Sequence, residues 1–354
     1  MAMGKSFRAD SDRELVRFES LKDDLPYARV HANVHKSGGP LDIDLVIHPA
    51  GSLATDSNLG SDRTEASISF QKRIRVNGLP RRFSDYLGQV NVVLFSPEDI
   101  QQISGPPSLR RQYLDAVLCQ LDSKYLHNLQ RYNQILAQRN HLLRLLQEGR
   151  ASAEELVFWS DQLVSFGSYL VLARLQLVEA LNRLAPPLHE AITESRERLE
   201  LALIHNLGHL EEPSLNAISQ SFREGLQEAK RQEMERGVSL VGPHRDDLRL
   251  LINGADAGAY GSRGQHRTII ISLRLAQAQL HRSRTGEDPV LLLDDILSEL
   301  DSSRRQYLLS SIQPYQQVFL TTTDPERASA WNLIRATMFQ VKQGALYAME
   351  GSSI

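Results

Sequence analysis

The sequence has little cysteine, no long apolar run and almost no net charge. Cys119 is the only cysteine among 354 residues, so no disulfide can form within the chain, and its apolar neighbours favour a buried, unreactive thiol. No apolar stretch reaches the roughly 18–20 residues that cross a membrane, and residues 1–5 lack the apolar core of a signal peptide. The 40 Lys and Arg residues nearly balance the 43 Asp and Glu residues, which excludes a histone-like polycation. We therefore expect a cytoplasmic protein without membrane attachment, in which a local patch makes any contact with nucleic acid.

A phosphate-binding P-loop is also lacking. Its pattern is G-x-x-x-x-G-K-[ST], in which backbone N–H groups and a lysine surround the phosphates of ATP. Gly4-Lys5-Ser6 matches the end of this pattern, but the first glycine would fall before Met1. No strand precedes these residues, and residues 7–13 are too polar for the helix that should pack on the sheet. We expect that Gly4-Lys5-Ser6 does not form a P-loop.

What the sequence does contain is a β-rich segment from about residue 29 to residue 95. Residues 41–47 alternate between apolar and polar types, as half-buried strands do, and residues 73–76 run into Asn77-Gly78, a strong hairpin signal. Residues 90–95 are continuously apolar apart from one Asn and predict a buried strand. Residues 51–63 are rich in Gly, Ser and Asp and predict a loop.

A helical block follows this segment. Apolar residues at three- and four-residue steps predict one helix over residues 109–146, and a capping box at residues 152–155 opens a second. Pro186-Pro187 should end the second helix, with a further helical stretch to about residue 203 and a last helix over residues 214–236. Strands return at residues 238–241 and 248–252. We therefore predict an α/β fold in which residues 1–107 and 237–354 form one lobe and residues 108–236 are inserted as an all-helical lobe.

Two adjacent carboxylates end the most informative strand. Residues 290–293 are apolar and are followed by Asp294 and Asp295. In P-loop NTPases the first carboxylate at this place holds Mg²⁺ beside the phosphates of ATP. We expect Asp294 to be the Mg²⁺ ligand and Asp295 to be the catalytic residue that orients an attacking water. Taken alone, an acidic pair after a strand is more often a solvated turn.

The order of further motifs argues against that simpler interpretation. A third carboxylate, Asp301, follows Asp294 by seven residues, which is the spacing of the Walker B and D-loop motifs of ABC-type ATPases. Upstream, residues 260–267 lead directly into an apolar helix, with Ser262 and Gly264 placed as in an ABC signature motif. A helix N-terminus with a Ser hydroxyl and a close glycine backbone favours phosphate. The residues expected to contact the ATP of a partner subunit are Ser262, Gly264, Gln265, Arg267 and Asp301.

These motifs, with others along the chain, resemble the RecF family of SMC-like, ABC-type ATPases. The resemblance rests on LFSPED at residues 94–99, GPPSLRR at 105–111, VGPHRDDL at 241–248, YGSRGQHR at 260–267 and LDDILSELD at 293–301. It implies an ABC-type P-loop ATPase head, built from a mixed sheet with helices, and an inserted lobe that shapes a DNA-binding cleft. It further implies a protein of DNA replication, DNA damage repair and the SOS response. Such a protein binds ATP and Mg²⁺, forms an ATP-dependent homodimer, binds single-stranded and gapped DNA, and helps to load RecA with RecO and RecR.

The same resemblance locates the missing P-loop. Residues 4–8 and 12–18 are similar to the family's segment that follows the Walker A helix. We therefore expect that the first strand, the P-loop and its helix lie outside this chain, through a late start or a shortened polypeptide; a natural protein without a P-loop is the alternative. Without these groups nothing holds the phosphates against Asp294, so we predict that the chain as written neither binds nor hydrolyses ATP appreciably and is only marginally stable.

Basic residues supply the candidates for DNA contact. Such charges are more often solvated surface than binding groups, but in a cleft they would bind phosphates with little base specificity and strong salt dependence. The candidates are Lys72, Arg73, Arg75, Arg81, Arg82, Arg110 and Arg111. Two functions remain open: an ATP-gated DNA-repair ATPase, or a non-enzymatic DNA-binding adaptor that keeps the head scaffold. An ABC transporter subunit is disfavoured by the helical insertion and by the absence of a switch His after residue 320.

Overall fold

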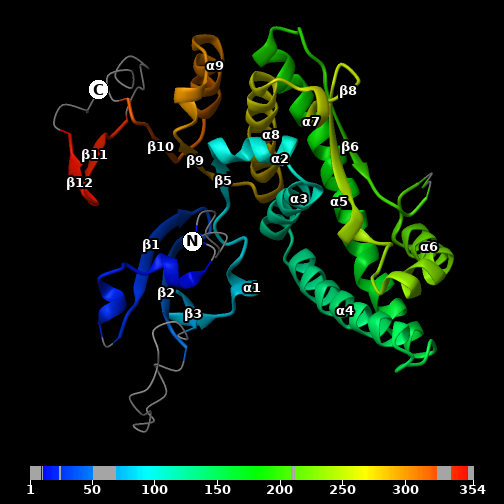
Figure 1. Ribbon diagram of the computed structural model, residues 1–354. Helices are drawn as coiled ribbons and strands as arrows, with labels where there is room; N and C mark the ends of the chain where they lie inside the picture. Colours follow the sequence, from blue (N-terminus) through cyan, green and yellow to red (C-terminus); the bar gives the residue numbers. More distant parts are fainter. Residues whose placement is uncertain are drawn as a thin grey trace.

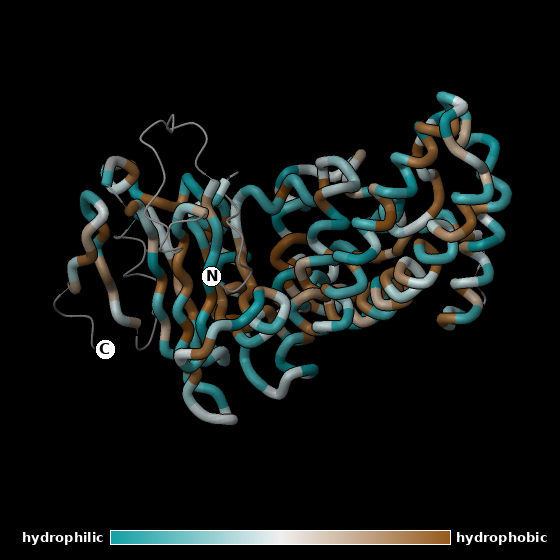
Figure 2. The backbone as a smooth tube through the Cα atoms, turned by 90° about the horizontal axis from the view of Figure 1, so that it is seen from below, coloured by the Kyte–Doolittle hydropathy of each residue, from teal (hydrophilic) through white to brown (hydrophobic). Residues whose placement is uncertain are grey.

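The computed structural model describes residues 9, 11–23, 25–50, 69–208, 210, 212–324 and 336–349. Gly4-Lys5-Ser6 and the predicted loop at residues 51–63 lie outside the described residues. In Figure 1 most strands lie on the left and centre of the molecule, whereas the long helices α4, α5 and α6 lie on the right, together with the strands β6 and β8. The hydropathy-coloured view in Figure 2 separates the same two parts, and its apolar segments run through the interior of each.

An antiparallel sheet begins the head. Its strands, in spatial order, are β1 (Ala28–Lys36), β2 (Gly39–Pro49), β3 (Phe70–Val76) and β4 (Leu79–Arg81), after two short 3₁₀ helices, η1 (Asp12–Leu15) and η2 (Ser20–Lys22). Alternate residues of β2, including Ile43 and Leu45, are buried with Ile74 of β3. The predicted hairpin is confirmed, because Asn77 and Gly78 between β3 and β4 have φ of 51° and 76°, as a tight two-residue turn requires.

A three-stranded parallel sheet forms the centre of the head. Its order is β10 (Val318–Thr321), β9 (Val290–Asp294) and β5 (Val92–Phe95), so the predicted strand before the acidic pair is the middle one. Leu291 and Leu293 of β9 are almost fully buried, together with Phe95 of β5. The long helix α8 (Arg263–Thr285) and α9 (Ser302–Ile312) contribute to the same core. Val290 and Leu292, on the other face of β9, are partly buried, so residues 290–293 are apolar on both faces of the strand.

Helices dominate the insertion. The long ones are α3 (Pro107–Leu121), α4 (Ser123–Gln147), α5 (Glu155–Thr193) and α6 (Leu215–Arg236); short ones at its entrance are α1 (Phe83–Tyr86), η4 (Pro97–Ile100) and α2 (Gln101–Ser104). The central helix α5 packs against α4, α6 and α8, so one helix joins the insertion to the head. It is also the one helix of the described part of the chain whose length and composition would let it cross a membrane, and these contacts account for its apolar character.

Two helix boundaries differ from the prediction. The single helix expected over residues 109–146 is divided at Asp122, whose side chain accepts a hydrogen bond from the N–H of Lys124 and so caps α4. Conversely, α5 continues through Pro186 and Pro187 to residue 193. An interior proline costs about 3 kcal/mol because it removes a backbone hydrogen bond. The buried stripe of α5 continues on both sides of the prolines, and each buried side chain contributes about 1.5–3 kcal/mol.

The helical stretch expected after the prolines ends at Thr193, and its continuation to residue 203 is wrong. The chain instead forms β6 (Leu199–Ile204), which pairs antiparallel with β7 (Asp247–Ile252) and is extended by β8 (Ala255–Asp256). The strand expected at residues 238–241 is absent, because these residues form a turn that leads into η5 (Pro243–Arg245). After β8 come α7 (Ala257–Tyr260) and α8; η6 (Ile296–Glu299) follows β9, and a hairpin of β11 (Phe339–Lys342) and β12 (Ala345–Ala348) ends the described chain.

Candidate nucleotide site

The acidic pair lies at the carboxyl end of the central strand. Asp294 is the last residue of β9 and stands in register with Thr321, the last residue of β10. The Thr321 hydroxyl donates to Asp294 Oδ1 at 2.8 Å and accepts from the backbone N–H of Asp295 at 3.1 Å. The structure therefore brings both carboxylates together with a hydroxyl from the neighbouring strand. Ligand sites in open α/β sheets occupy this edge, beyond the carboxyl ends of the strands.

Asp295 has a feature that a purely structural turn does not need. It is not the left-handed backbone, with φ of 51°, because Asp adopts this conformation in turns more readily than most residues. Its Oδ1 atom is buried and has no hydrogen-bond partner among the described residues. An unsatisfied buried acceptor costs about 1–3 kcal/mol. Such costs concentrate at functional sites, where a bound group takes up the free acceptor.

The groups at this edge fit Mg²⁺ delivered with a nucleotide. Mg²⁺ prefers oxygen ligands and usually binds through one or two carboxylates, with waters and substrate phosphates completing its shell. Asp294, Asp295 and Thr321 supply oxygens only. No group of three or more His, Cys, Asp or Glu residues in the described part of the chain could hold a metal ion by itself. The residues present suit a metal shared with phosphate better than a separate structural metal.

The predicted signature residues begin helix α8. Ser262 is its N-cap: Ser262 Oγ accepts from the N–H of Gln265 at 3.2 Å, and Gln265 Oε1 accepts from the N–H of Ser262 at 2.8 Å. In this reciprocal capping box the first-turn N–H groups of residues 263 and 264 keep no acceptor within the helix. A Cβ atom on Gly264 would come no closer than 3.8 Å to another group, so internal packing does not require glycine there. The missing side chain leaves this end of the helix open.

Asp301 lies close to this helix end. It caps α9 by accepting from the N–H of Arg304 at 2.9 Å, and its second oxygen pairs with the Arg304 guanidinium at 2.7 Å. The backbone hydrogen bond from Arg304, followed by the charge of its guanidinium, lowers the pKa of Asp301. The same guanidinium lies 4.0 Å from the position of a Cβ on Gly264. The D-loop and the signature thus lie beside each other, next to a cleft of about 420 Å³ between the ends of α5 and α9.

Arg267 joins these two motifs in a way that the sequence did not indicate. Its guanidinium pairs with Glu299 of η6 at 2.8 Å, and both side chains are 29% exposed. The predicted contact of Arg267 with ATP stays a prediction, whereas its contact with Glu299 ties the signature helix to the segment between Asp295 and Asp301. Spacing could not reveal this pair, because the partners are 32 residues apart.

The predicted DNA-binding residues do not form one patch. Alternation along β3 exposes Arg73 and Arg75 on one face and turns Lys72 to the other, where it pairs with Asp12. Arg81 and Arg82 are exposed at the end of β4. The remaining two candidates are used within the fold, as described next.

Arg110 and Arg111 anchor the insertion to the strand β7. Arg110 makes two hydrogen bonds to the carboxylate of Asp247, at 2.6 and 2.9 Å, and its side chain is only 13% exposed. Arg111 donates to the carbonyl of Asp246 at 2.8 Å. The structure therefore gives both residues an internal role that the sequence prediction did not include. Whether they also contact DNA stays a prediction.

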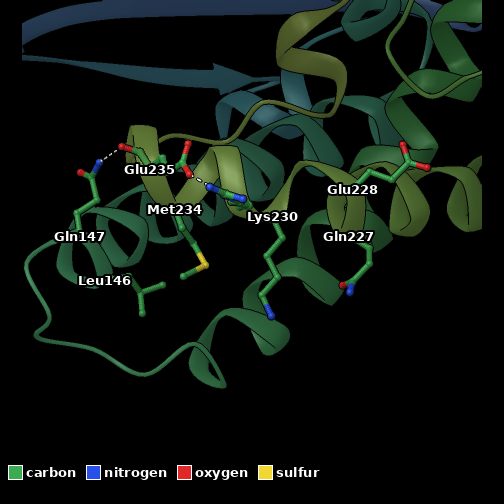
Figure 3. A pocket seen from close by; sticks show the side chains of 8 residues that line it. Leu146, Gln147, Gln227, Glu228, Lys230, Met234 and Glu235 are labelled. Atoms are coloured by element: carbon green, nitrogen blue, oxygen red, sulfur yellow. Dashed lines mark hydrogen bonds and ion pairs between the residues drawn. The ribbon is translucent and has the colours of Figure 1, made fainter.

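A larger cavity, of about 750 Å³, lies elsewhere (Figure 3). It is lined by residues from the end of α4 and from α6, including Leu146, Met234 and Glu235. No residue of β9, α8 or α9 lines it. This cavity is therefore no part of the nucleotide site.

The arrangement defines the class of protein: an ABC-type ATPase head, with a mixed sheet and helices, into which a largely helical lobe is inserted. None of the protein-family models matches the chain. Curated relatives match nearly all of it. The DNA replication and repair protein RecF of Halalkalibacterium halodurans is 37% identical over 348 residues, covering 98% of this chain and 87% of the relative. RecF of Herpetosiphon aurantiacus is 39% identical over 354 residues, covering 98% and 88%.

A solved structure agrees with these relatives. The structure described as the recombination mediator protein RecF-ATP in the RecFOR pathway matches with a TM-score of 0.81 and 29% identity, over 98% of this chain and 85% of that one. The chain belongs to the RecF family of DNA replication and repair proteins, as its motifs indicated.

Proposed function

We propose that this protein acts in recombinational DNA repair as an ATP-dependent homodimer. The observation that carries the proposal is the open start of α8, capped by Ser262 and lying against the D-loop residues Asp301 and Arg304. Backbone N–H groups at a helix start suit a phosphate group, and here the phosphate is the terminal one of the ATP bound to the partner subunit. Asp294 would hold Mg²⁺ and Asp295 would orient water. A scaffold that serves only as an adaptor has no need for the buried free acceptor of Asp295.

Partners follow from the family. A solved relative is described as a mediator in the RecFOR pathway, and we propose that this chain likewise works with RecR and RecO to assist RecA loading on single-stranded and gapped DNA. Arg73 and Arg75 are the strongest DNA candidates, because both are exposed on one face of β3 and form no ion pair within the described residues. Arg81 and Arg82 follow.

Nucleotide binding is tested best when a P-loop is present. The 354 residues contain no G-x-x-x-x-G-K-[ST] pattern, so we propose that this polypeptide by itself does not hold ATP at Asp294. A chimera that adds a P-loop segment from an ATP-binding member of the family should bind Mg²⁺–ATP and dimerise with it. Ser262→Ala should abolish the dimer, measured by sedimentation velocity, without reducing ATP binding, because Ser262 faces the partner's nucleotide. A Ser262→Ala chimera that dimerises as well as its parent would refute the proposal.

DNA binding has a separate test. Replacing Arg73 and Arg75 by Gln should weaken binding of a single-stranded oligonucleotide. The slope of log K against the logarithm of the salt concentration should become shallower by about 1.4, since each lost phosphate contact removes about 0.7 from it. Arg29→Gln is the matched control, because Arg29 lies on the same sheet but is already paired with Asp44 at 2.6 Å. Equal salt dependence in the double variant and the control would remove β3 from the DNA interface.

A further inference from the structure

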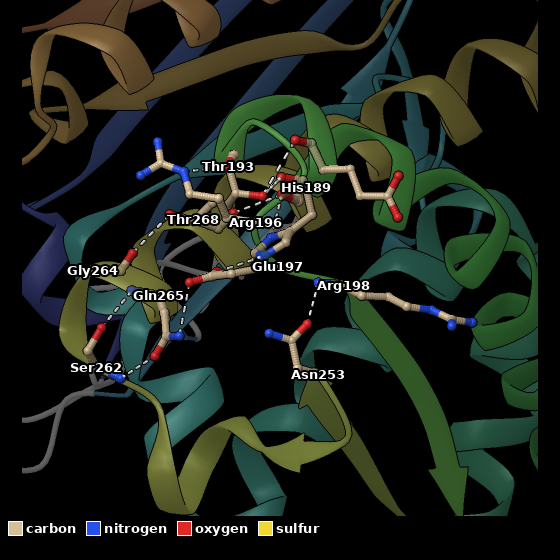
Figure 4. Close-up of polar contacts among 12 residues, drawn as sticks. His189, Thr193, Arg196, Glu197, Arg198, Asn253, Ser262, Gly264, Gln265 and Thr268 are labelled. Carbon is tan, nitrogen blue, oxygen red and sulfur yellow. Dashed lines mark hydrogen bonds and ion pairs between the residues drawn. The ribbon is translucent and has the colours of Figure 1, made fainter.

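Glu197 connects the helical insertion to the signature motif. It lies in the short turn between α5 and β6, and its side chain is 19% exposed. Glu197 Oε1 accepts from Gln265 Nε2 at 3.0 Å, while Oε2 lies 3.1 Å from His189 Nε2 (Figure 4). One carboxylate therefore contacts both α5 and the first turn of α8. No sequence motif pointed to it.

The turn that presents Glu197 is itself strained. Glu194 and Ser195 are consecutive non-glycine residues in the left-handed region, with φ of 53° and 59°. Each costs about 1–2 kcal/mol relative to a right-handed conformation. The backbone N–H of Ser195 reaches back to the carbonyl of Glu190 at 2.7 Å, which closes the end of α5 tightly. This sharp reversal brings Glu197 against α8.

The carboxylate decides which way the Gln265 amide faces. A carboxylate only accepts hydrogen bonds, so the NH₂ of Gln265 must point toward Glu197. Gln265 Oε1 then points the other way and accepts from the N–H of Ser262 at 2.8 Å. If the amide were reversed, its NH₂ would meet the N–H of Ser262 and the capping box would be lost. Glu197 and the N–H of Ser262 thus favour the same amide orientation, the one that closes the start of α8.

His189 holds the other oxygen of the carboxylate in place. It is fully buried, and burial lowers the pKa of its imidazole. Because a carboxylate only accepts hydrogen bonds, Nε2 donates to Glu197. Its second nitrogen lies 3.3 Å from Ser272 Oγ on α8. With both oxygens engaged, the carboxylate cannot rotate away from Gln265.

We propose that Glu197 is a positioning residue that orients Gln265, and through it the Ser262 cap of the signature, from the end of the inserted lobe. The hydrogen bonds of Glu197 with Gln265 and His189 exist in the chain without nucleotide. Their importance for dimer formation rests on the proposed function of the signature. A movement of the end of α5 would release the Gln265 amide. The start of α8, where the phosphate is proposed to bind, would then be less ordered. The partner's ATP and the insertion would therefore be linked through this carboxylate.

Hydrogen exchange of the 354-residue chain tests the contact between Glu197 and Gln265 in the absence of nucleotide. In Glu197→Ala the hydrogen-bonded amides of Ser262, Gln265 and His266 should exchange roughly fivefold faster relative to those of residues 275–280 in the same helix, because a lost helix cap weakens the helix end by that factor. The ratio of the two exchange rates cancels the effect of any general loss of stability, because such a loss changes both rates alike. Glu194→Ala is the matched control: Glu194 lies in the same turn but pairs only with the exposed Arg196, at 2.7 Å, and the ratio should not change.

Glu197→Gln separates positioning from charge. Its oxygen can still accept from Gln265, and its NH₂ can donate to His189 if that ring shifts its proton to Nδ1, beside Ser272. The ratio should therefore stay near that of the parent. An unchanged ratio in Glu197→Ala, or an equal rise in the Gln and Ala variants, would overturn the proposal.

Dimerisation of the P-loop chimera tests the part of the inference that rests on the proposed function. Glu197→Ala should weaken the ATP-dependent dimer at least fivefold while leaving ATP binding unchanged, and Glu197→Gln should restore it. The two proposals fail differently. If Ser262→Ala still dimerises, the proposed role of the signature is wrong whatever the exchange ratio; if Ser262→Ala abolishes the dimer and Glu197→Ala does not affect it, the positioning role is wrong.

Discussion

Gly242 offers the sharpest test of how one family motif acts. It belongs to the VGPHRDDL segment and precedes η5, with φ of 126° and ψ of 178°, a conformation essentially limited to glycine. A Cβ atom there would lie 2.6 Å from Phe222 Cζ and 2.6 Å from the Tyr132 hydroxyl. Neither group can move easily, because both side chains are buried and the hydroxyl is hydrogen-bonded to His244 Nδ1 at 2.6 Å.

The cost of Gly242→Ala has two parts. Holding a non-glycine residue in this conformation costs about 1–3 kcal/mol, and forcing an extra carbon into a packed interior costs about 1–3 kcal/mol more. We therefore expect the free energy of unfolding to fall by about 2–6 kcal/mol. Gly254→Ala is the control, because Gly254 has φ of 80° and no atom within 4 Å of its added carbon. That variant should lose only the backbone part, about 1 kcal/mol.

Urea denaturation followed by circular dichroism at a helix wavelength measures both values, since more than one lobe contributes helix to the signal. Gly242→Ala should shift the midpoint strongly downward and Gly254→Ala only slightly. If the two variants lost equal stability, the contact with Phe222 and Tyr132 would contribute nothing. The inference that this motif is constrained by packing would then be wrong.

Three further predictions concern the buried charges and the nucleotide. Asp99→Ala should lower the free energy of unfolding by about 3–5 kcal/mol in urea denaturation, because it leaves the buried Arg274, now paired at 2.7 Å, without its partner. Burial lowers the pKa of His281 from 6.5 to about 4. The folded protein then binds this proton less readily than the unfolded chain, so His281 should lower stability by about 3 kcal/mol as the pH falls from about 6.5 toward 4. This adds to the decline from His244, whose pKa burial also lowers to about 4. His281→Leu should flatten the combined decline in melts recorded across this range; an unchanged slope would contradict the assignment. Equilibrium dialysis of the 354-residue chain with Mg²⁺–ATP should detect no binding, and binding that Asp294→Asn abolishes would show that another segment replaces the P-loop.

Much of the fold could be predicted from local sequence. The strand β9 follows from its apolar run, and α9 begins after Asp301 because a short acidic side chain is a strong N-cap. Wrong predictions arose where distant contacts outweighed local preference. Residues 199–204 contain good helix formers, yet they form β6, because pairing with β7 supplies both hydrogen bonds and a buried face. No local pattern reports that partner.

The candidate site shows the same division. The acidic pair, the signature and the D-loop could be recognised because each has a fixed spacing within a few residues. Glu197 could not, since it meets Gln265 across 68 residues and belongs to no pattern. Basic residues were the weakest guide: a cluster such as Arg110-Arg111 looks the same in sequence whether its charges meet DNA or, as with Arg110, a carboxylate 137 residues away.

Three side-chain contacts from different parts of the chain hold the signature helix in place. Asp99 of the LFSPED segment pairs with Arg274, a buried residue in the middle of α8. Glu197 holds the first turn of that helix, and Arg267 joins it to η6. A phosphate-binding site made of backbone N–H groups binds well only if the helix is ordered before the ligand arrives, because ordering the helix during binding would cost free energy. The turn after α5, the helix η4 after β5 and the helix η6 before Asp301 each contribute one of these contacts, so the position of α8 depends on all three.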